Sequence, residues 1–210
     1  MTILAHRGYW NNQIEQNSLK ALKTALEKGY GFESDVRDHM ERLVISHNIA
    51  TSVSQDAEEV LSLLNEFNDM YCFAVNIKAD GLKELLKSLF YKYSINNYFL
   101  FDMSVPQMVE FREMGLRYFT RQSEVEPEPY MYDDAAGVWV DGFGSVGWIT
   151  RELLEGHMDN GKEICLVSPE LHNKIDYRRF WKTIKEYNLN TEKLMLCTDY
   201  PDEAKEFFDE

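Results

Sequence analysis

The chain has 210 residues, of which 44% are hydrophobic and 13% aromatic, a composition that favours a globular protein with a sizeable core. Its formal net charge of −14 argues against a nucleic-acid partner and against stable association with an anionic membrane, because both partners require a basic surface. An anionic substrate would need basic side chains that are gathered locally.

Short apolar runs alternate along the chain with segments of helical periodicity. We expect eight strands, at residues 2–6, 31–37 with a continuation at 43–48, 71–78, 97–103, 116–122, 137–143, 163–169 and 193–199. Helices are expected between them, at residues 17–31, 56–67, 81–93, 105–115, 150–161 and 177–188. An acidic, proline-broken connection at residues 125–136 takes the place of one helix.

This alternation predicts an α/β fold. Apolar strands separated by helices indicate a parallel sheet that is covered on both faces. Eight such units without a break in composition predict one (β/α)8 TIM barrel, with residues 1–210 as a single domain. An open doubly wound sheet is the alternative.

The cysteines and the apolar runs indicate where the protein resides. Cys72, Cys165 and Cys197 each lie inside an apolar run, which is typical of reduced core residues rather than of disulfides or a zinc site. We expect no signal peptide and no membrane span. The sequence therefore predicts a cytoplasmic protein.

Polar residues lie at or near the ends of the predicted strands. Since the carboxyl ends of the strands form the active face of such a barrel, we expect these side chains to converge on one mouth. They are His6, Arg7, Glu33, Asp35, Arg37, His47, Asn76, Lys78, Asp102, Arg121, Asp141, Ser168, Glu170 and Asp199.

The stretch "FESDVR" carries two carboxylates on one strand. Glu33 and Asp35 are two residues apart, so both side chains point to the same side. Such a pair can hold one Mg²⁺ or Ca²⁺ ion through its oxygen atoms. The alternative is a structural ion pair with Arg7 or Arg37, and the residues alone do not decide between the two.

Two histidines and three cations accompany the carboxylates. His6 and His47 can act as general base and general acid near neutral pH, although a single histidine is more often a structural residue. Arg7, Arg37 and Lys78 can hold an anionic group by charge-assisted hydrogen bonds. These residues are the local basic groups that an anionic substrate requires.

Three further residues are candidates for contacts with the substrate. Trp10 directly follows the stretch "HRGY" and is placed to form a wall of the pocket. Arg121 and Asp141 lie near strand ends and can select the alcohol part of a substrate, or they can pair with each other.

Taken together, these residues resemble the glycerophosphodiester phosphodiesterase family, relatives of the phosphatidylinositol-specific phospholipase C barrel. The family's His-Arg-Gly, Pro-Glu-Asn-Thr, Glu-x-Asp, histidine, Glu-x-Lys and Thr-Asp-x-Pro motifs are matched in order, some of them loosely. The matching stretches are "AHRG", "EQNSLKAL", "FESDVR", "LVISHN", "VNIK" and "CTDYP". The match is dense over residues 3–48 and sparse but collinear to residue 201.

The resemblance implies metal-assisted hydrolysis of a small phosphodiester and a place in lipid metabolism. In the family two histidines are general acid and base, and a hydroxyl of the substrate attacks first to give a cyclic phosphate that water then opens. The roles implied here are His6 and His47 in acid–base catalysis, Glu33 and Asp35 as ligands of Mg²⁺ or Ca²⁺, and Arg7 and Lys78 on the phosphate.

Two positions depart from the family's pattern. Asn76 and Gln16 stand where the family has glutamate, so metal binding should be weaker. Asp102, on the next strand, can compensate. We therefore expect a divergent phosphodiesterase. The alternatives are a non-catalytic phosphoester-binding barrel with a degenerate metal site and a lyase that stops at the cyclic phosphate. The sequence does not specify an oligomeric state.

Overall fold

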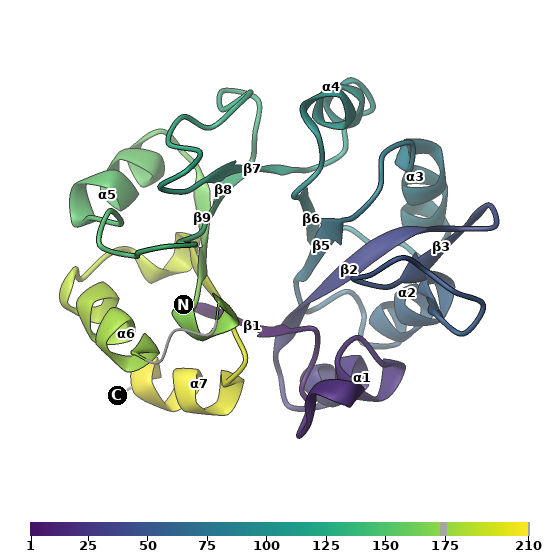
Figure 1. Ribbon diagram of the computed structural model, residues 1–210, viewed down its shortest axis with the longest axis horizontal. Coiled ribbons are helices and arrows are strands. Elements are labelled where there is room, and N and C mark those ends of the chain that lie inside the picture. The colour runs from purple at the N-terminus through teal and green to yellow at the C-terminus, as the bar shows by residue number, and fades with distance from the viewer. Residues whose placement is uncertain (173–175, 210) are drawn as a thin grey trace. The chain divides into compact units, whose positions relative to one another are not determined.

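A computed structural model describes residues 1–172 and 176–209, which form two compact units (Figure 1). The N-terminal unit is Ala5–Tyr118, and the C-terminal unit combines Met1–Leu4 with Phe119–Glu210. Each unit is a sheet packed with helices, so the predicted α/β class is confirmed. That residues 1–210 form one barrel domain stays a prediction.

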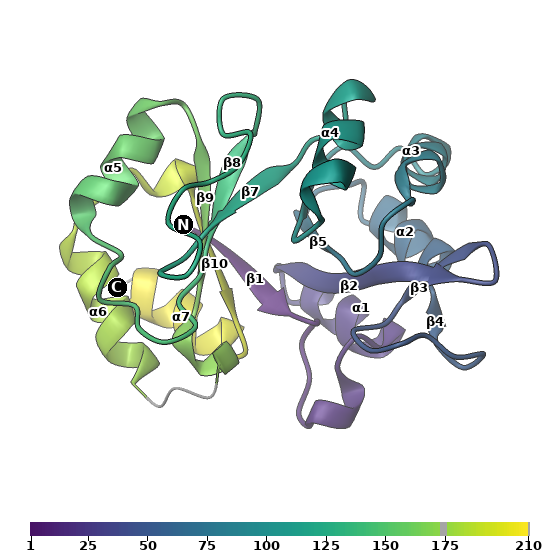
Figure 2. The ribbon, with the colours of Figure 1, turned by 45° about the horizontal axis from the view of Figure 1, so that its top comes forward.

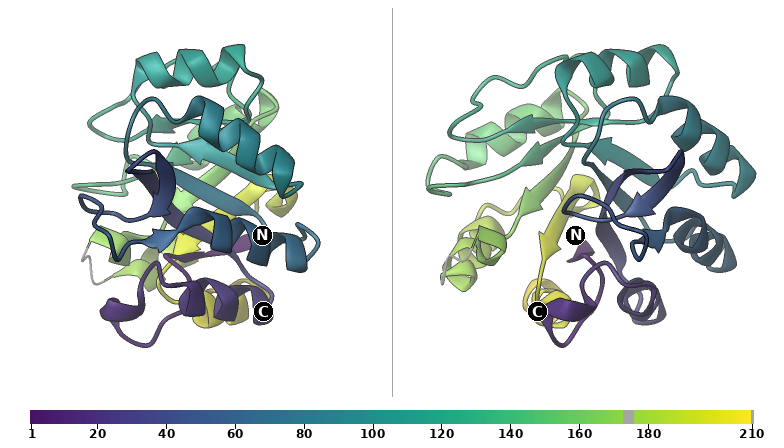
Figure 3. Two further views of the ribbon diagram at one scale, coloured as in Figure 1. Left: turned by 90° about the vertical axis from the view of Figure 1, so that its right-hand side faces the viewer. Right: turned by 45° about the vertical axis from the view of Figure 1, so that its right-hand side comes forward.

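The N-terminal unit contains the end of β1 (Thr2–His6) and five further strands: β2 (Gly31–His39), β3 (Arg42–Ile45), β4 (Gln55–Asp56), β5 (Phe73–Ile77) and β6 (Tyr98–Phe101). Strands β2, β5 and β6 are parallel neighbours. The helices are η1 (Gln13–Glu15), α1 (Leu19–Glu27), α2 (Ala57–Glu66), α3 (Lys83–Lys92) and α4 (Val105–Glu113). The four α-helices contact one another in chain order, and α1 and α2 also contact strands (Figures 1 and 3).

Local capping explains why these helices begin where they do. Ser18 accepts a hydrogen bond from the backbone N–H of Ala21, and Ser104 accepts one from that of Gln107. Such caps satisfy N–H groups that have no partner within the helix. Helix α1 ends just before Gly29, which has a φ of 86°. The helices predicted in this unit are confirmed, with ends that differ by a few residues.

Strand β2 differs from the sequence prediction. The sequence predicted one strand with a continuation, whereas β2 and β3 form an antiparallel hairpin in which Val36 pairs with Ile45. The turn is made by Met40 and Glu41, whose φ angles are 48° and 65°. These residue types rarely adopt that conformation, so the sequence carried no turn signal there.

The C-terminal unit has four parallel strands in the order β10-β9-β8-β7 (Figure 2). They are β7 (Phe119–Gln122), β8 (Gly137–Val140), β9 (Glu163–Val167) and β10 (Leu194–Thr198). The helices are α5 (Arg151–Asp159), η2 (Pro169–His172), α6 (Tyr177–Glu186), η3 (Thr191–Lys193) and α7 (Pro201–Asp209). The segment 125–136 contains no helix or strand, as predicted.

The ladders within each unit do not form the closed barrel that the sequence predicted. In the N-terminal unit the sheet ends at β6, beyond which residues 5–118 add an isolated bridge between Leu100 and Tyr118. In the C-terminal unit the sheet ends at β7. Each unit therefore has an open sheet.

Two further predictions concern the cysteines and membrane spans. Cys72, Cys165 and Cys197 form no disulfide within residues 1–172 and 176–209, and Cys165 and Cys197 are buried in strands. Within residues 1–172 and 176–209, no helix has both the length and the apolar character needed to cross a bilayer.

Candidate active site

The turn after β1 places two of the predicted residues. His6 ends the strand, and Arg7 and Gly8 follow with φ angles of 54° and 88°. A Cβ atom on Gly8 would lie 2.7 Å from the backbone carbon of Ala21, so only glycine lets the turn pack this closely on α1. The N–H of Tyr9 donates to the carbonyl of Ala21 at 2.9 Å. Packing on α1 thus fixes the direction in which His6 and Arg7 leave the strand.

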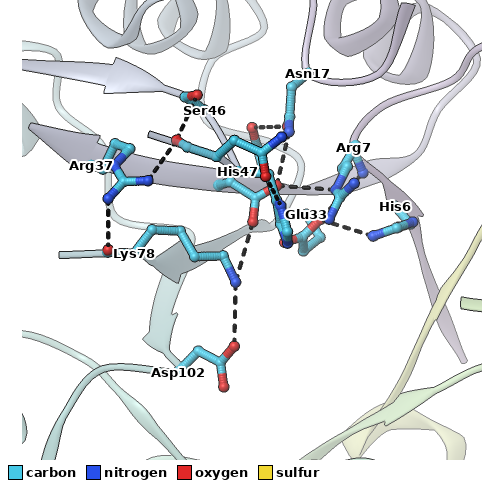
Figure 4. Close-up of polar contacts among 12 residues, drawn as sticks. His6, Arg7, Asn17, Glu33, Arg37, Ser46, His47, Lys78 and Asp102 are labelled. Carbon is cyan, nitrogen blue, oxygen red and sulfur yellow. Dashed lines mark hydrogen bonds and ion pairs between the residues drawn. The ribbon is translucent and has the colours of Figure 1, made fainter. Parts of the chain in front are cut away.

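Glu33 and Asp35 are buried on β2, with side chains 2% and 0% exposed. The Nε2 atom of His6 lies 3.9 Å from Oε2 of Glu33, and the backbone N–H of Arg7 donates to the same oxygen at 3.3 Å. The Nε atom of Arg7 lies 3.0 Å from Oδ2 of Asp35 as an ion pair without hydrogen-bond alignment. Figure 4 shows His6 and Arg7 beside Glu33.

Lys78 links the carboxylate on β2 to the next strands. It directly follows β5, and its Nζ atom lies 3.4 Å from Oδ1 of Asp35 and 3.5 Å from Oδ2 of Asp102 (Figure 4). Asp102 directly follows β6 in a left-handed conformation, with φ at 69°. Three predicted site residues from three parallel strands therefore meet in one charged cluster.

Burial changes the titration of Glu33. Loss of water around the side chain, and next the charge of Asp35, raise its pKa to about 7. His6, Arg7 and Lys78 oppose this increase. Such a carboxyl holds its proton readily and ionises more easily when another positive charge is near.

Asn17 is a part of the cluster that sequence reasoning missed. Its side-chain amide donates to Oδ2 of Asp35 at 2.8 Å, and its Oδ1 accepts from the Ser34 hydroxyl at 2.7 Å. The cap of helix α1 is its neighbour Ser18. The place of Asn17 inside the stretch "EQNSLKAL", which matches a family motif, was the available signal.

Two buried oxygen atoms at the site lack hydrogen bonds. Asp35 pairs with Asn76 in the ladder between β2 and β5, so their side chains leave the sheet on the same side. The Oδ1 atom of each is buried without a hydrogen-bond partner. In the described part of the chain no group of three or more His, Cys, Asp and Glu side chains is placed to hold a metal ion. A metal site at these carboxylates would therefore need an amide oxygen, such as that of Asn76, as a further ligand.

His47 lies in a cleft of about 430 Å³ that it shares with Arg7 and Gln16. It follows β3 in a segment without regular secondary structure and is exposed. Its Nδ1 atom is 3.1 Å from the side-chain oxygen of Asn48. Gln16, which replaces the family's glutamate, accepts a hydrogen bond from Arg7 at 3.2 Å.

Arg37 makes contacts that the sequence did not predict. Its guanidinium donates to the backbone carbonyl of Asn48 at 2.5 Å and to that of Lys78 at 3.5 Å. Both acceptors belong to the protein itself. A role on the phosphate stays a prediction, and the contacts favour a structural role.

The other predicted contact residues have partners of their own. The indole N–H of Trp10 donates to the carbonyl of His6 at 2.9 Å. In the C-terminal unit, Arg121 pairs with Glu126 at 3.1 Å, and Asp141 pairs with His172 at 2.7 Å. In the same unit Glu170 accepts hydrogen bonds from the Ser168 hydroxyl and the Asp199 backbone. Their roles toward a substrate stay predictions.

No protein-family model matches the chain, and no curated protein matches it. Solved structures do. A glycerophosphodiester phosphodiesterase from Parabacteroides distasonis superposes with a TM-score of 0.77 at 16% identity, covering 99% of this chain and 96% of that one. An Oleispira antarctica phosphodiesterase, solved with the product sn-glycerol-3-phosphate, gives 0.75 at 13% identity and covers 100% and 97%.

A structure with a different activity also matches, less well. Phosphoribosyl anthranilate isomerase from Thermus thermophilus gives a TM-score of 0.53 at 11% identity, covering 99% and 95% of the two chains. The resemblance to glycerophosphodiester phosphodiesterases is thus confirmed at the level of the fold. A fold can carry many activities, so the activity must be argued from the site.

Proposed function

We propose that this chain is a divergent glycerophosphodiester phosphodiesterase that hydrolyses small phosphodiesters with the help of a divalent cation. One observation carries the proposal: His6, Arg7 and Lys78 surround the buried carboxylates of Glu33 and Asp35. The fold shared with phosphodiesterases supports it.

Arg7 and Lys78 are the groups that would bind the phosphate. Their side chains are 21% and 20% exposed, and both pair with Asp35. Half-buried cations attract an anion more strongly than cations in bulk water. They also supply positive charge where the phosphoryl oxygens gain negative charge during the reaction. A chain of net charge −14 thereby gains a local site for an anion.

His6 and His47 are the groups that would move protons. His6 lies beside Glu33, a carboxylate that can stabilise its protonated form. His47 is exposed in the cleft, where a substrate can reach it. An imidazole titrates close to neutral pH, so one can accept a proton while the other donates one.

The residues present fit a divalent cation. Glu33, Asp35 and Asn76 would hold it, because carboxylate and amide oxygens are ligands that Mg²⁺ and Ca²⁺ prefer. The buried Oδ1 atoms of Asp35 and Asn76 lack hydrogen bonds, and a cation would satisfy both. When bound, such an ion withdraws charge from the phosphoryl group as a Lewis acid.

The lining of the cleft favours a substrate with an uncharged, hydroxylated alcohol. Amide side chains of Gln13, Gln16 and Gln55 line it together with the hydroxyls of Ser46 and Ser54. Among the described residues that line this cleft there is no carboxylate and no Phe, Tyr or Trp ring, the groups that bind a quaternary ammonium ion. Amides and hydroxyls instead donate to and accept from alcohol groups.

A phosphoester-binding protein without turnover is the second candidate. Asp35 is already paired with Arg7, which is one of the two structural ion pairs weighed from the sequence, and also with Lys78. A metal ion must compete with these two pairs. Turnover therefore decides between the two functions.

Hydrolysis of two diesters tests the proposal: bis(p-nitrophenyl) phosphate and the p-nitrophenyl diester of glycerol 3-phosphate, which carries the hydroxyl that attacks first in the family. We expect release of p-nitrophenol that stops after treatment with a chelator and returns when Mg²⁺ or Ca²⁺ is added. Binding of inorganic phosphate without any turnover, under either condition, would instead support the phosphoester-binding protein.

A further inference from the structure

Arg37 connects two segments that carry proposed site residues. It lies on β2 two residues after Asp35, and therefore on the same face of the strand as both carboxylates. Its guanidinium donates to the carbonyls of Asn48 and Lys78, which are 11 and 41 residues away along the chain. Asn48 lies in the segment after β3, and Lys78 directly follows β5. The planar fork of arginine suits two acceptors at once.

The segment around His47 depends on such contacts. Residues 46–50 contain no helix or strand, so no ladder holds them. The N–H of Ser46 donates to the carbonyl of Asp35 at 2.9 Å. The carbonyl of Asn48 accepts from both Arg37 and the Ser46 hydroxyl, at 2.5 and 3.0 Å.

The Asn48 side chain continues this path to the imidazole. Its Oδ1 atom lies 3.1 Å from Nδ1 of His47. A partner at one ring nitrogen fixes the orientation of the ring and determines the state of the other nitrogen. Because Arg37 holds the backbone of Asn48, it also holds the group that orients His47.

The second acceptor is the backbone of Lys78. The N–H of Lys78 donates to the carbonyl of Val36 at 2.9 Å, and its carbonyl accepts from Arg37. Both bonds come from β2. They hold the base of a side chain whose Nζ atom lies between Asp35 and Asp102.

We propose that Arg37 is a positioning residue, which orients His47 through Asn48 and holds the backbone of Lys78, and that it does not bind the phosphate. The inference rests on the proposed phosphodiesterase function. The inference replaces the interpretation of Arg37 as a third phosphate-binding cation. It predicts that replacement of Arg37 lowers turnover rather than substrate binding.

The test compares Arg37→Gln with Arg42→Gln, a matched change on the neighbouring strand. Both variants and the wild type are assayed with the p-nitrophenyl diesters named above in the presence of Mg²⁺ or Ca²⁺. Arg42 is exposed and pairs with Asp56 at 3.5 Å. We expect kcat of Arg37→Gln to fall between about tenfold and a hundredfold, as for a misplaced catalytic group. KM should stay within about threefold, and Arg42→Gln should resemble the wild type.

Two additional variants separate positioning from stability alone. Arg37→Lys keeps the charge but not the fork, so it should restore only part of kcat. Asn48→Ala should lower kcat by itself. In the double variant Arg37→Gln/Asn48→Ala, kcat should fall by less than the product of the two single losses, because both changes remove contacts that orient His47. Circular dichroism at the assay temperature confirms that each variant is folded.

The outcomes are distinct. A raised KM with unchanged kcat in Arg37→Gln, or fully additive losses in the double variant, would overturn the positioning role while leaving the phosphodiesterase function in place. If the wild-type chain itself shows no turnover with any divalent cation, the proposed function fails, and the positioning role fails with it.

Discussion

Asp35 and Asn76 lie opposite each other in the ladder between β2 and β5, and each has a buried Oδ1 atom without a hydrogen-bond partner. The Lys78 ammonium lies 3.4 Å from Oδ1 of Asp35. Buried polar atoms usually have partners. The pair therefore marks the position at which a cation would be most strongly favoured.

This relationship predicts that Asn76→Glu tightens metal binding. A second negative ligand opposite Asp35 raises the charge of the site, which is what sets affinity for Mg²⁺ and Ca²⁺. Titration calorimetry should show a dissociation constant at least about tenfold lower, or about 1.4 kcal/mol. Asn65→Glu, on the exposed face of α2, is the control for added charge. Equal affinities in the Asn76 and Asn65 variants would show that position 76 does not face the metal.

Replacement of His47 tests acid–base catalysis. The side chain is exposed, so His47→Ala should change the free energy of unfolding by no more than about 0.5 kcal/mol. Its turnover of a generic phosphodiester should fall by at least about a hundredfold. His39→Ala, at the end of β2, removes an imidazole outside the cleft and should have little effect. Turnover by His47→Ala that equals that of His39→Ala would reject the assignment.

Binding of phosphomonoesters tests the preference of the cleft. Glycerol 3-phosphate and phosphocholine carry the same phosphate on a neutral or a cationic alcohol, and we expect the former to bind at least about tenfold more tightly. Gln13→Glu places a carboxylate in the cleft and should narrow the difference in affinity between the two ligands. Asn65→Asp, which adds the same charge outside the cleft, is the control. A stronger affinity for phosphocholine in the wild type would contradict an uncharged alcohol.

The C-terminal unit carries a pH-dependent element. His157 on α5 is buried, with Nε2 2.7 Å from Oε1 of Gln122 and Nδ1 2.8 Å from the Tyr132 hydroxyl. Burial lowers its pKa below the ordinary 6.5, and Lys162 lowers it further. The unfolded chain therefore binds this proton more readily than the folded chain does.

The stability that neutral His157 contributes is present above about pH 6.5 and is lost as the pH falls through the lower pKa of the folded state. Urea unfolding between pH 7.5 and pH 5 should show a decreasing free energy of unfolding. His157→Gln should be less stable at pH 7.5 but lose less on acidification. The same pH slope in both proteins would mean that His157 does not titrate as described.

Helices and parallel strands could be predicted from the sequence because caps and apolar periodicity are local signals. Ser18 and Gly29, for example, mark the ends of α1 where the structure has them. The β2–β3 hairpin could not be predicted, since Met40 and Glu41 give no sign of a turn. Pairing between strands that are far apart in sequence has no local signal either.

The candidate site was predictable in part for a similar reason. The spacing of Glu33 and Asp35 follows from strand geometry, so their shared face was predictable. The contacts of Asn17 with Asp35 and of Arg37 with two backbone carbonyls were not predictable, because they depend on how separate segments come together. Arg37 looked like one more cation near the carboxylates, and only its distance to the carbonyl of Asn48 shows its actual partner.

Phosphorus-31 NMR of glycerophosphodiester turnover tests the central claim most directly. With Mg²⁺ or Ca²⁺ present, the signal of the diester should be replaced by that of a phosphomonoester, and Asp35→Asn should abolish the change. A cyclic phosphate that persists would identify a lyase. A diester signal that stays unchanged with the folded wild-type chain and either cation would contradict the account.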